Sequence, residues 1–426
     1  MKKDIKILAI ETSCDETAAA LIGVENNQPV ILSNIVSSQI DLHAKTGGVV
    51  PEVASRAHME AITPVVTEAI GQKPDYYSIL KNEIDYIAVT AGPGLVGSLL
   101  VGFNAAKSLA YALDKPIIAV NHIEGHIYSA LGGEIRNPKP CLPAGRSEIL
   151  NKSKNSNDQN SKNVSSFELR VSNFPLIALT VSGGHSSLTL MQNHGKYQNI
   201  GQTLDDASGE AFDKVAKLLE LGYPGGPVVS KLASEYRENL KLKISNLQSI
   251  SNDKIVKNTL IENCPEGHPK GEKLKIDNSL KGIVFPRPIL NDGTFNFSFS
   301  GLKTAVLQKV LNIKKERELR DEDKREICAA FEDAVVDVLT TKTIRAAEKY
   351  KPKAIILAGG VAANGQLRDT IEAKISKLSF SVKYLPAPRN LTGDNAAMIG
   401  LAAYYHIQKN KIDCWDKIKV DSNMEL

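Results

Sequence analysis

Short apolar runs alternate with amphipathic stretches along the first third of the chain, which is typical of strands that alternate with helices. The apolar runs that predict buried strands cover residues 5–10, 84–90 and 117–120. Helical spacing of apolar positions predicts a helix over 52–69, and a second helix over 98–112 follows a glycine-rich loop. A strand–helix–strand succession of this kind forms a parallel sheet with covered faces, so we expect an α/β protein.

One arrangement occurs twice in the chain. A strand, a polar turn and a returning strand cover residues 5–24, and the same succession returns at 176–191. In each half a later apolar strand then enters a glycine turn and a helix, at 84–112 and at 354–375. The repetition predicts an internal duplication into two similar α/β lobes with a cleft between them. Ligands of such sheets gather at the carboxyl ends of strands and between domains.

Two polar segments interrupt the pattern. Residues 134–173 contain a stretch rich in Ser, Asn and Lys that cannot bury enough apolar surface to offset its ordering entropy, so we expect a disordered insertion. A second polar, lysine-rich insertion covers 240–282. The expected domains are a first lobe over 1–133, completed by the last helix over 394–408, a second lobe over 174–393, and a tail over 409–426.

Composition narrows the class of protein. The 426 residues suffice for two domains, and the formal charge of +4 is compatible with an RNA partner without arguing for one. The five cysteines are scattered and form no Cys-x-x-Cys, which fits a reducing cytosol and argues against a disulfide framework or a cysteine zinc site. No run approaches the ~20 apolar residues of a membrane span, so we expect a cytoplasmic protein without membrane attachment.

A pair of histidines suggests a metal site. His122 and His126 stand four positions apart directly after the strand 117–120, so a helix there would place both imidazoles on one face. Asp394, in a Thr-Gly-Asp-Asn loop before the last helix, is the best third ligand, and its alternative role is to cap that helix. Two histidines and one carboxylate leave coordination positions open, as at a catalytic ion. The protease motif His-Glu-x-x-His is absent from this segment.

Glycine turns favour a nucleotide ligand. Backbone N–H groups at residues 182–184, 225–226 and 359–360 could hold phosphate, although no P-loop motif occurs. The polar tip of the first hairpin, residues 11–17, adds hydroxyls and acids. Its plain alternative is a solvated turn.

A dinucleotide fingerprint matches in its letters only. The loop reads Gly92-x-Gly94-x-x-Gly97, the spacing of NAD-binding loops. That fingerprint needs an acid at the carboxyl end of the next strand, where it would hold the ribose. Asp114 precedes that strand, and its carboxyl end carries Asn121 and His122, so we disfavour an NAD site.

Five longer motifs resemble those of one family, and they occur in the family's order. They read Ile10-Glu-Thr-Ser-Cys-Asp-Glu-Thr17, Asn121-His-Ile-Glu-Gly-His126, Val181-Ser-Gly-Gly-His185, Phe297-Ser-Phe-Ser-Gly-Leu-Lys-Thr304 and Gly359-Gly-Val-Ala-Ala-Asn364. Together they resemble TsaD, the family that forms threonylcarbamoyladenosine in tRNA and was once called O-sialoglycoprotein endopeptidase. The resemblance covers nearly the whole chain outside the insertions and the tail. It implies an actin-like ATPase (ASKHA) fold of two lobes.

The resemblance also implies a reaction and its site. The threonylcarbamoyl group would pass from threonylcarbamoyl-adenylate to the exocyclic amine of the adenosine 3′ of the anticodon, in tRNAs that read codons beginning with A, and AMP would be released. One divalent metal ion, iron in preference to zinc, would be held by His122, His126 and Asp394. The residues implied to contact the adenylate are Thr180, Val181, Ser182, Gly183, Gly184, Asp213, Gly226 and Asn364.

Three assignments stay open. Asp15 and Glu16 are the candidates for the base that accepts the amine proton, and the alternative is that they orient water or a partner subunit. Ser230 stands where some relatives carry an acid, which leaves that contact unassigned. We expect tRNA to contact the Lys/Arg-rich region 303–325 and the rim of the cleft.

The resemblance implies protein partners, and the fold leaves other functions possible. The implied partners are the paralogue TsaB and the ATPase TsaE, with the adenylate supplied by TsaC. The alternatives are an ATPase or sugar kinase of the same fold and a non-catalytic scaffold paralogue. The set of His122, His126 and Asp394 discriminates among them, because a kinase does not need it and a scaffold paralogue would lack the histidine pair.

Overall fold

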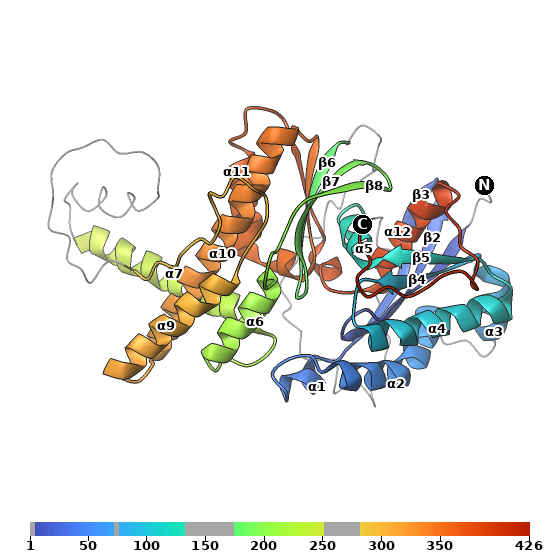
Figure 1. Ribbon diagram of the computed structural model, residues 1–426, viewed down its shortest axis with the longest axis horizontal. Coiled ribbons are helices and arrows are strands. Elements are labelled where there is room, and N and C mark those ends of the chain that lie inside the picture. Colours follow the sequence, from blue (N-terminus) through green and yellow to red (C-terminus); the bar gives the residue numbers. More distant parts are fainter. Residues whose placement is uncertain (1–4, 72–75, 133–173, 251–281) are drawn as a thin grey trace.

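The computed structural model describes residues 5–71, 76–132, 174–250 and 282–426. The insertion expected over 134–173 therefore lies outside the described residues. Phe174, the residue that follows it, is buried. The second expected insertion began at residue 240, but residues 240–250 are helical and continue the helix that starts at Gly225. The described chain forms two five-stranded sheets with helices around them (Figure 1).

The first half supplies the first sheet and its outer helices. Its elements are β1 (Lys6–Glu11), β2 (Glu16–Glu25), β3 (Gln28–Ser38), α1 (Ile40–Ala44), α2 (Pro51–Ala69), α3 (Tyr76–Glu83), β4 (Tyr86–Gly92), α4 (Val96–Leu113), β5 (Ile117–Asn121) and α5 (His122–Ser129). The strands and helices predicted in this half are all present, with ends shifted by one or two residues.

The second half supplies the second sheet and two groups of helices. Its strands are β6 (Leu176–Val181), β7 (Ser186–Asn193), β8 (Lys196–Gln202), β9 (Ala354–Ala358) and β10 (Lys383–Pro386). Its helices are α6 (Ser208–Leu218), α7 (Gly225–Ile250), α9 (Ser300–Glu316), α10 (Asp321–Tyr350), η3 (Gly360–Ala363), α11 (Gly365–Ile375), η4 (Arg389–Leu391) and α12 (Ala396–Gln408).

The two sheets have the same topology. The first runs β3-β2-β1-β4-β5, and the second, read in the same sense, runs β8-β7-β6-β9-β10. In each sheet the first three strands pair antiparallel, and the fourth and fifth strands join in parallel. The predicted fold class, two duplicated α/β lobes, is confirmed.

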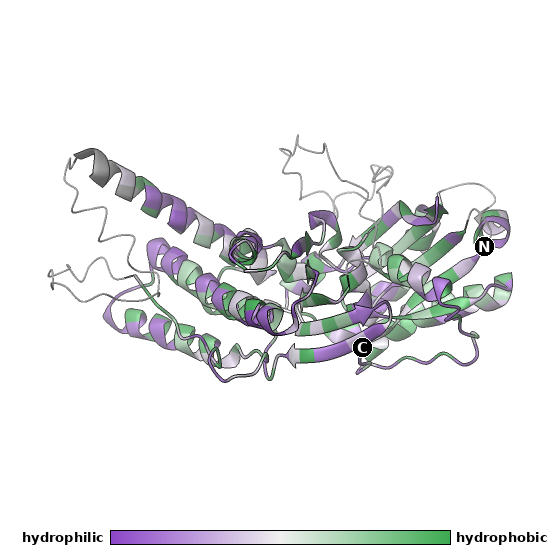
Figure 2. Ribbon diagram, turned by 90° about the horizontal axis from the view of Figure 1, so that it is seen from above, coloured by the Kyte–Doolittle hydropathy of each residue, from purple (hydrophilic) through white to green (hydrophobic). Residues whose placement is uncertain are grey.

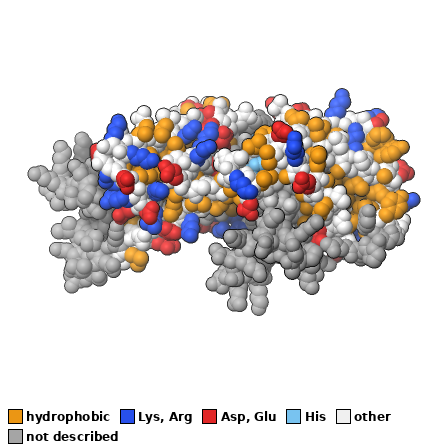
Figure 3. All heavy atoms as spheres, turned by 90° about the horizontal axis from the view of Figure 1, so that it is seen from below, with side chains coloured by type: hydrophobic (Ala, Val, Ile, Leu, Met, Phe, Trp, Pro, Cys, Tyr) orange, Lys and Arg blue, Asp and Glu red, His pale blue; other side chains and the backbone are white. Residues whose placement is uncertain are grey.

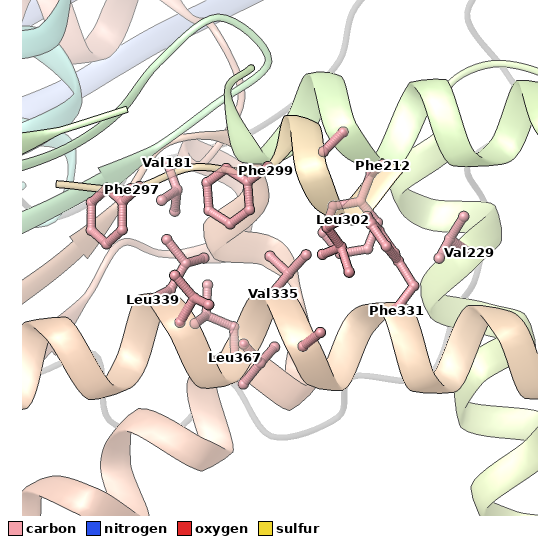
Figure 4. Packing of buried hydrophobic residues seen from close by; sticks show 14 of the residues in the cluster. Val181, Phe212, Val229, Phe297, Phe299, Leu302, Phe331, Val335, Leu339 and Leu367 are labelled. Carbon is pink, nitrogen blue, oxygen red and sulfur yellow. The ribbon is translucent and has the colours of Figure 1, made fainter. Parts of the chain in front are cut away.

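Alternation along the strands assigns each sheet face to its own group of helices. In β1, Leu8 and Ile10 pack in the cluster that contains residues of α2 and α4, whereas Ile7 and Ala9 face the other way. In β6, Leu179 and Val181 pack in the cluster of α6, α7, α9, α10 and α11, and Figure 4 shows Val181 among these helices. Ile7, Ala9 and their counterparts on β6 share one further cluster with α5 and α12. These two helices thus connect the lobes. Figure 2 shows hydrophobic residues in the strands and hydrophobic residues alternating with hydrophilic ones along the helices.

The end of the chain returns to the first lobe. The N–H of Ala397 in α12 donates to Oδ1 of Asn34 at 3.1 Å. The expected tail, residues 409–426, then runs along the same lobe, where the N–H of Asp413 donates to the carbonyl of Ile117 at 3.0 Å and that of Asp421 to Ala91 at 2.9 Å. The tail is therefore packed on the first lobe and forms part of it.

Helix α4 is long and apolar enough to cross a membrane by length and composition. In the structure it lies against the first sheet, with Phe103, Ala106 and Ala110 in the same cluster as Leu8 and Ile10. We therefore interpret α4 as a core helix of the first lobe.

Candidate active site

The histidine pair is positioned by the junction of β5 and α5. Asn121 ends the strand, and its side-chain Oδ1 accepts hydrogen bonds from the N–H groups of Ile123 at 2.8 Å and Glu124 at 3.2 Å. This is an N-cap, so α5 begins directly at His122. One turn later His126 lies on the same face, with the two ring centroids 4.6 Å apart. The predicted common face of the two imidazoles is present.

Asp394 meets both imidazoles. Its Oδ1 lies 3.1 Å from Nε2 of His126 and 3.6 Å from Nε2 of His122. Potential ligand atoms of the three residues all lie within 4.8 Å of one another. The alternative role of Asp394 as a helix cap is wrong, because Asn395 caps α12 through a hydrogen bond from the N–H of Met398 at 3.1 Å. The carboxylate of Asp394 is therefore left to face the histidines.

This donor set fits a divalent cation. The ring of His126 is fully buried, its Nδ1 has no hydrogen-bond partner in the described part of the chain, and its Nε2 faces Oδ1 of Asp394 at 3.1 Å without a well-aligned hydrogen bond. A buried polar atom without a partner carries a desolvation cost that a bound cation would offset. Two imidazoles and a carboxylate suit a transition-metal ion and leave coordination positions open.

The electrostatics of the site favour a positive charge. Burial alone would lower the pKa of His122, but the carboxylates of Asp394 and Glu11 raise it to about 9. Burial would raise the pKa of Asp394, yet His122 and His126 hold it well below its usual range. The surrounding carboxylates thus stabilise a cation at this point, either a proton on His122 or a metal ion that displaces it.

Ser13 and Glu11 of the polar hairpin tip lie behind His122, a role that the sequence did not predict for them. Nδ1 of His122 lies 3.0 Å from Oγ of Ser13 and 3.3 Å from Oε2 of Glu11. Glu11 is fully buried and also accepts hydrogen bonds from the N–H of Ser13 and the hydroxyl of Thr90. A carboxylate on the far nitrogen of a ligating histidine fixes the ring so that Nε2 faces the metal. The sequence signal that could have indicated this role is the acid Glu11 directly after the apolar run 5–10.

Asp15 and Glu16, the candidate bases, lie at the tip of the β1–β2 hairpin. Asp15 is buried, and Oε1 of Glu16 accepts a hydrogen bond from Ser38 at 3.2 Å. Burial, with the charges of Asp15 and Asp394, raises the pKa of Glu16 well above its usual value. Burial and then the charge of Asp15 also raise the pKa of Tyr223 in the second lobe. Asp15 therefore interacts electrostatically with that lobe.

A third imidazole approaches from the second lobe. His185, in the turn between β6 and β7, has its ring centroid 6.4 Å from that of His122. Burial and the charges of His122 and His126 lower its pKa to about 4, so His185 is a neutral imidazole at neutral pH. It was quoted in a motif but not assigned to the site. His185 therefore brings the β6–β7 turn of the second lobe close to the cluster of His122, His126 and Asp394.

The end of β6 and the turn that follows it contain five of the residues implied to contact the adenylate, and their contact with that ligand stays a prediction. Gly183 and Gly184 are exposed, and the hydroxyl of Ser182 accepts a hydrogen bond from the N–H of His185 at 3.1 Å. Thr180 is fully buried, and its Oγ1 has no hydrogen-bond partner in the described residues. Val181 differs from these residues, because its side chain packs in the second lobe's core (Figure 4). Only its backbone is left to meet a ligand.

Asp213 and Gly226 lie where α6 faces the start of α7. Oδ1 of Asp213 accepts a hydrogen bond from the N–H of Gly225 at 2.7 Å, and burial raises the pKa of this carboxyl. The segment 223–227 was expected to be a turn, but α7 begins at Gly225. Gly226 is therefore in the first turn of a helix, where N–H groups point outward and suit an anion.

Asn364 is held within the protein. Its Oδ1 caps α11 by accepting from the N–H of Leu367 at 2.8 Å. Its Nδ2 donates to Oγ of Ser230 at 2.9 Å and to Oε1 of Glu332 at 2.6 Å. Both amide hydrogens are thus used, so a ligand contact from this side chain is confined to Oδ1. The position left unassigned in the sequence, Ser230, is a neighbour of Asn364 in this network.

The comparison with known proteins decides the family. The sequence profile of TsaD, described as tRNA N6-adenosine threonylcarbamoyltransferase, matches residues 30–164, 160–254 and 243–401. The chain belongs to the TsaD family. It is 41% identical to the tRNA N6-adenosine threonylcarbamoyltransferase of Geobacillus kaustophilus over 96% of this chain and 94% of the relative. It is 40% identical to the transferase of that name from Bacillus subtilis over 97% and 94% of the two chains. A TsaD chain is a transferase that acts on tRNA.

Similar solved structures share little sequence with this TsaD chain. HypF from T. kodakarensis has 13% identity and a TM-score of 0.43, covering 96% of this chain and 49% of that one. The activator of 2-hydroxyisocaproyl-CoA dehydratase from Clostridium difficile, with bound ADPNP, has 12% identity and a TM-score of 0.43, covering 99% and 100%. YeaZ from Pseudomonas aeruginosa has 20% identity and a TM-score of 0.22, covering 30% and 48%.

Proposed function

We propose that the chain transfers the threonylcarbamoyl group from threonylcarbamoyl-adenylate to the exocyclic amine of the adenosine 3′ of the anticodon and releases AMP. The tRNAs are those that read codons beginning with A. One observation carries the proposal: His185 brings the glycine turn of the second lobe next to the cluster of His122, His126 and Asp394. The glycine turn would then bind the adenylate part of the substrate, and a cation at the three-residue cluster would bind the threonylcarbamoyl part of the same molecule.

The second lobe offers a seat for the adenylate. A Cβ added to Gly183, Gly184, Gly226 or Gly360 would meet no atom of the described residues within 4 Å. Backbone N–H groups at such turns and at the start of α7 can approach a phosphate closely. These open glycines support the assignment of the phosphate to the second lobe.

The first lobe would hold one divalent metal ion, for which we favour iron over zinc. When bound by His122, His126 and Asp394, the ion would polarise the carbamoyl carbonyl or anchor the threonyl group. Ser13 and Glu11 hold the ring of His122 with Nε2 toward Asp394. This support acts before any ligand arrives, which lowers the reorganisation needed during the reaction.

The transfer itself needs positioning and the removal of one proton. The adenosine amine attacks the carbamoyl carbon, the bond from that carbon to the phosphate oxygen breaks, and AMP departs with the electron pair. The amine proton passes to a base, and we assign this step to Asp15 or Glu16 at the buried hairpin tip. The electrostatic interactions of the tip with Asp394 and with the second lobe support this choice.

The tRNA would meet the second lobe along α9 and the start of α10. Within this region Lys314, Arg317 and Arg325 are already paired with Glu220, Asp323 and Glu235. Lys303, Lys309 and Lys315 have no ion-pair partner in the described chain, so they are the stronger candidates for phosphate contacts. Figure 3 shows Lys and Arg mixed with Asp and Glu over one face of this lobe, on the left.

Protein partners would be the paralogue TsaB and the ATPase TsaE, with the adenylate made by TsaC, in the cytoplasm. The first lobe offers an apolar surface for such a partner. Met59 of α2 and Val96, Leu100 and Tyr111 of α4 are large hydrophobic residues that are exposed. The last three follow helical spacing along one face of α4.

The decisive experiment is a reconstituted transfer. Purified chain, partner proteins and threonylcarbamoyl-adenylate are incubated with an unmodified tRNA, and the nucleosides are analysed by mass spectrometry. We expect threonylcarbamoyladenosine and an equal amount of AMP. A tRNA with guanosine 3′ of the anticodon is the matched control and should remain unmodified. Absence of the modified adenosine in the first tRNA would refute the proposal.

A further inference from the structure

Helix α5 also makes polar contacts on the face opposite the two histidines of the His122, His126 and Asp394 cluster. Glu124 lies two residues from each histidine, which turns its side chain about 200° away from them. The residue is only 4% exposed. Its Oε1 accepts a hydrogen bond from the hydroxyl of Tyr197 at 2.5 Å, and its Oε2 lies 2.9 Å from Nε2 of His406.

The partners of Glu124 come from both lobes. Tyr197 is on β8 of the second lobe, and His406 is on α12, which packs on the first. The same face of α5 carries Tyr128, whose hydroxyl lies 3.0 Å from Nδ1 of His194 in the β7–β8 turn. Tyr405 of α12 stacks on Tyr128 and His194, with centroid distances of 4.7 and 4.5 Å. The back of α5 is thus connected to the second lobe by two contacts.

The contact between Tyr197 and Glu124 is strengthened by burial, because Glu124 is withdrawn from water and Tyr197 is half-buried. Burial and then the charge of Glu124 raise the pKa of Tyr197, so its hydroxyl stays protonated and donates. A hydrogen bond from a neutral donor to a buried carboxylate is stronger than one between neutral groups. Its loss would leave one carboxylate oxygen without its donor, at a full desolvation cost.

We propose that Glu124 is a positioning residue that couples the place of the second lobe to the geometry of the metal ligands. Its hydrogen bond to Tyr197 sets the rotation of α5 about its axis. Because His122 and His126 stand on the opposite face of this short helix, that rotation sets where both imidazoles point. The inference rests on the metal site proposed above. It assigns to Tyr197, which lies outside the cluster, a measurable effect on metal affinity.

The test uses Tyr197→Phe in the full-length chain, since this change removes the hydroxyl and keeps the ring. Tyr384→Phe is the matched control, because the hydroxyl of Tyr384 is buried in the same lobe without a hydrogen-bond partner in the described residues. Zn²⁺ affinity is measured by competition with a chromophoric chelator. We expect Tyr197→Phe to weaken Zn²⁺ binding by about tenfold, as removal of a group that orients a metal ligand does. Tyr384→Phe should bind Zn²⁺ as the wild type does.

Two further measurements separate positioning from stability. Thermal unfolding of the metal-free proteins should show a larger loss of stability in Tyr197→Phe than in Tyr384→Phe, because only the first leaves a buried carboxylate oxygen unpaired. The weaker Zn²⁺ binding of Tyr197→Phe should persist at a temperature where both variants are fully folded, and its kcat should fall while KM for the adenylate stays unchanged. Glu124→Gln keeps an oxygen for Tyr197 and should lose less Zn²⁺ affinity than Glu124→Ala. Wild-type Zn²⁺ affinity in Tyr197→Phe and Glu124→Ala would overturn the inference alone. A wild-type chain that binds no Zn²⁺ would overturn the metal site, and this inference with it.

Discussion

The two lobes share one strand order, but they use the same loop in opposite ways. In the first lobe the glycine turn after β4 is filled by the protein. A Cβ on Gly94 would lie 2.5 Å from the carbonyl oxygen of Ser13, and one on Gly92 only 1.7 Å from that of Asp421. In the second lobe the equivalent turn follows β9. A Cβ on Gly359 would lie 2.3 Å from the carbonyl oxygen of Val181, but one on Gly360 would meet no described atom within 4 Å. The repeated turn therefore keeps an open glycine in the second lobe, whereas Gly92 and Gly94 in the first lobe are both packed against protein.

The hairpin tips differ in the same sense. The first tip carries the acids Glu11, Asp15 and Glu16, and the second carries Ser182 and two glycines. Acids repel a phosphate and attract a cation, whereas backbone N–H groups do the reverse. The difference explains why we assign the metal to the first lobe and the adenylate to the second. The loop from Gly92 to Gly97 has no space for a dinucleotide, because neighbouring protein atoms are packed against its glycines.

The largest effect is expected from the residue that meets both histidines. Asp394→Ala removes the only carboxylate of the three-residue cluster, so the chain should lose its metal and at least about 100-fold of its transfer rate. Metal content and threonylcarbamoyladenosine formation are measured on the same sample. Asp416→Ala, at an exposed acid of the tail, is the control. Full metal content in Asp394→Ala would contradict the assignment.

The contrast between the two glycine turns is tested by one substitution in each. Gly94→Ala should destabilise the fold by about 1–3 kcal/mol, because the new methyl group overlaps the backbone of Ser13. Gly360→Ala should leave stability within about 0.5 kcal/mol and raise KM for the adenylate by about tenfold, because a methyl group there meets no described atom. Denaturant unfolding and steady-state kinetics measure the two effects. Equal stability losses in both variants would remove the distinction between a packed and an open turn.

A moderate effect is expected behind His122. Glu11→Gln keeps the size of the side chain but removes the charge that faces Nδ1 of His122, so metal affinity should fall by about 10- to 100-fold. KM for the adenylate should not change, because the second lobe binds it. The exposed Glu60→Gln serves as the control. An unchanged metal affinity in Glu11→Gln would show that Ser13 alone orients the ring.

The smallest effect is expected far from both turns, at a charge pair of the second lobe. Nζ of the buried Lys342 donates to Oδ1 of Asp292 at 2.8 Å and lowers the pKa of that carboxyl to about 2. A lowered folded-state pKa means that the pair stabilises the protein above pH 4 and that this contribution is lost between about pH 4 and 2. Asp292→Asn should therefore cost about 1–2 kcal/mol at pH 7 and only a small part of that at pH 2, where the carboxyl is half protonated in the folded protein.

This last variant is also an internal control for the site. Urea unfolding followed across pH measures the change in stability, while Zn²⁺ affinity and transfer rate should equal those of the wild type. A change in metal affinity would mean that the Lys342–Asp292 pair of the second lobe influences the metal ligands of the first lobe by a route other than the contact of Tyr197 with Glu124.

Much of this architecture was readable from the chain because its signals are local. The four-residue spacing of His122 and His126 follows from helix geometry, and the repeated strand–turn–strand pattern follows from the two-residue period of strands. Both depend on backbone geometry within a few residues. For the same reason the predicted strands, the helix over 52–69 and the duplication all appear in the structure.

The contacts between lobes were decided by the tertiary structure. Whether Asp394 would cap a helix or face the histidines depended on Asn395 taking the cap. The roles of Glu11, His185 and Tyr197 depended on how the sheets sit around α5, since no local pattern records which buried side chains meet across a chain of this length. Spacing along the sequence thus defined the ligand pair and indicated Asp394 as its third member, while tertiary packing brought Asp394 to the histidines and supplied the residues that orient them.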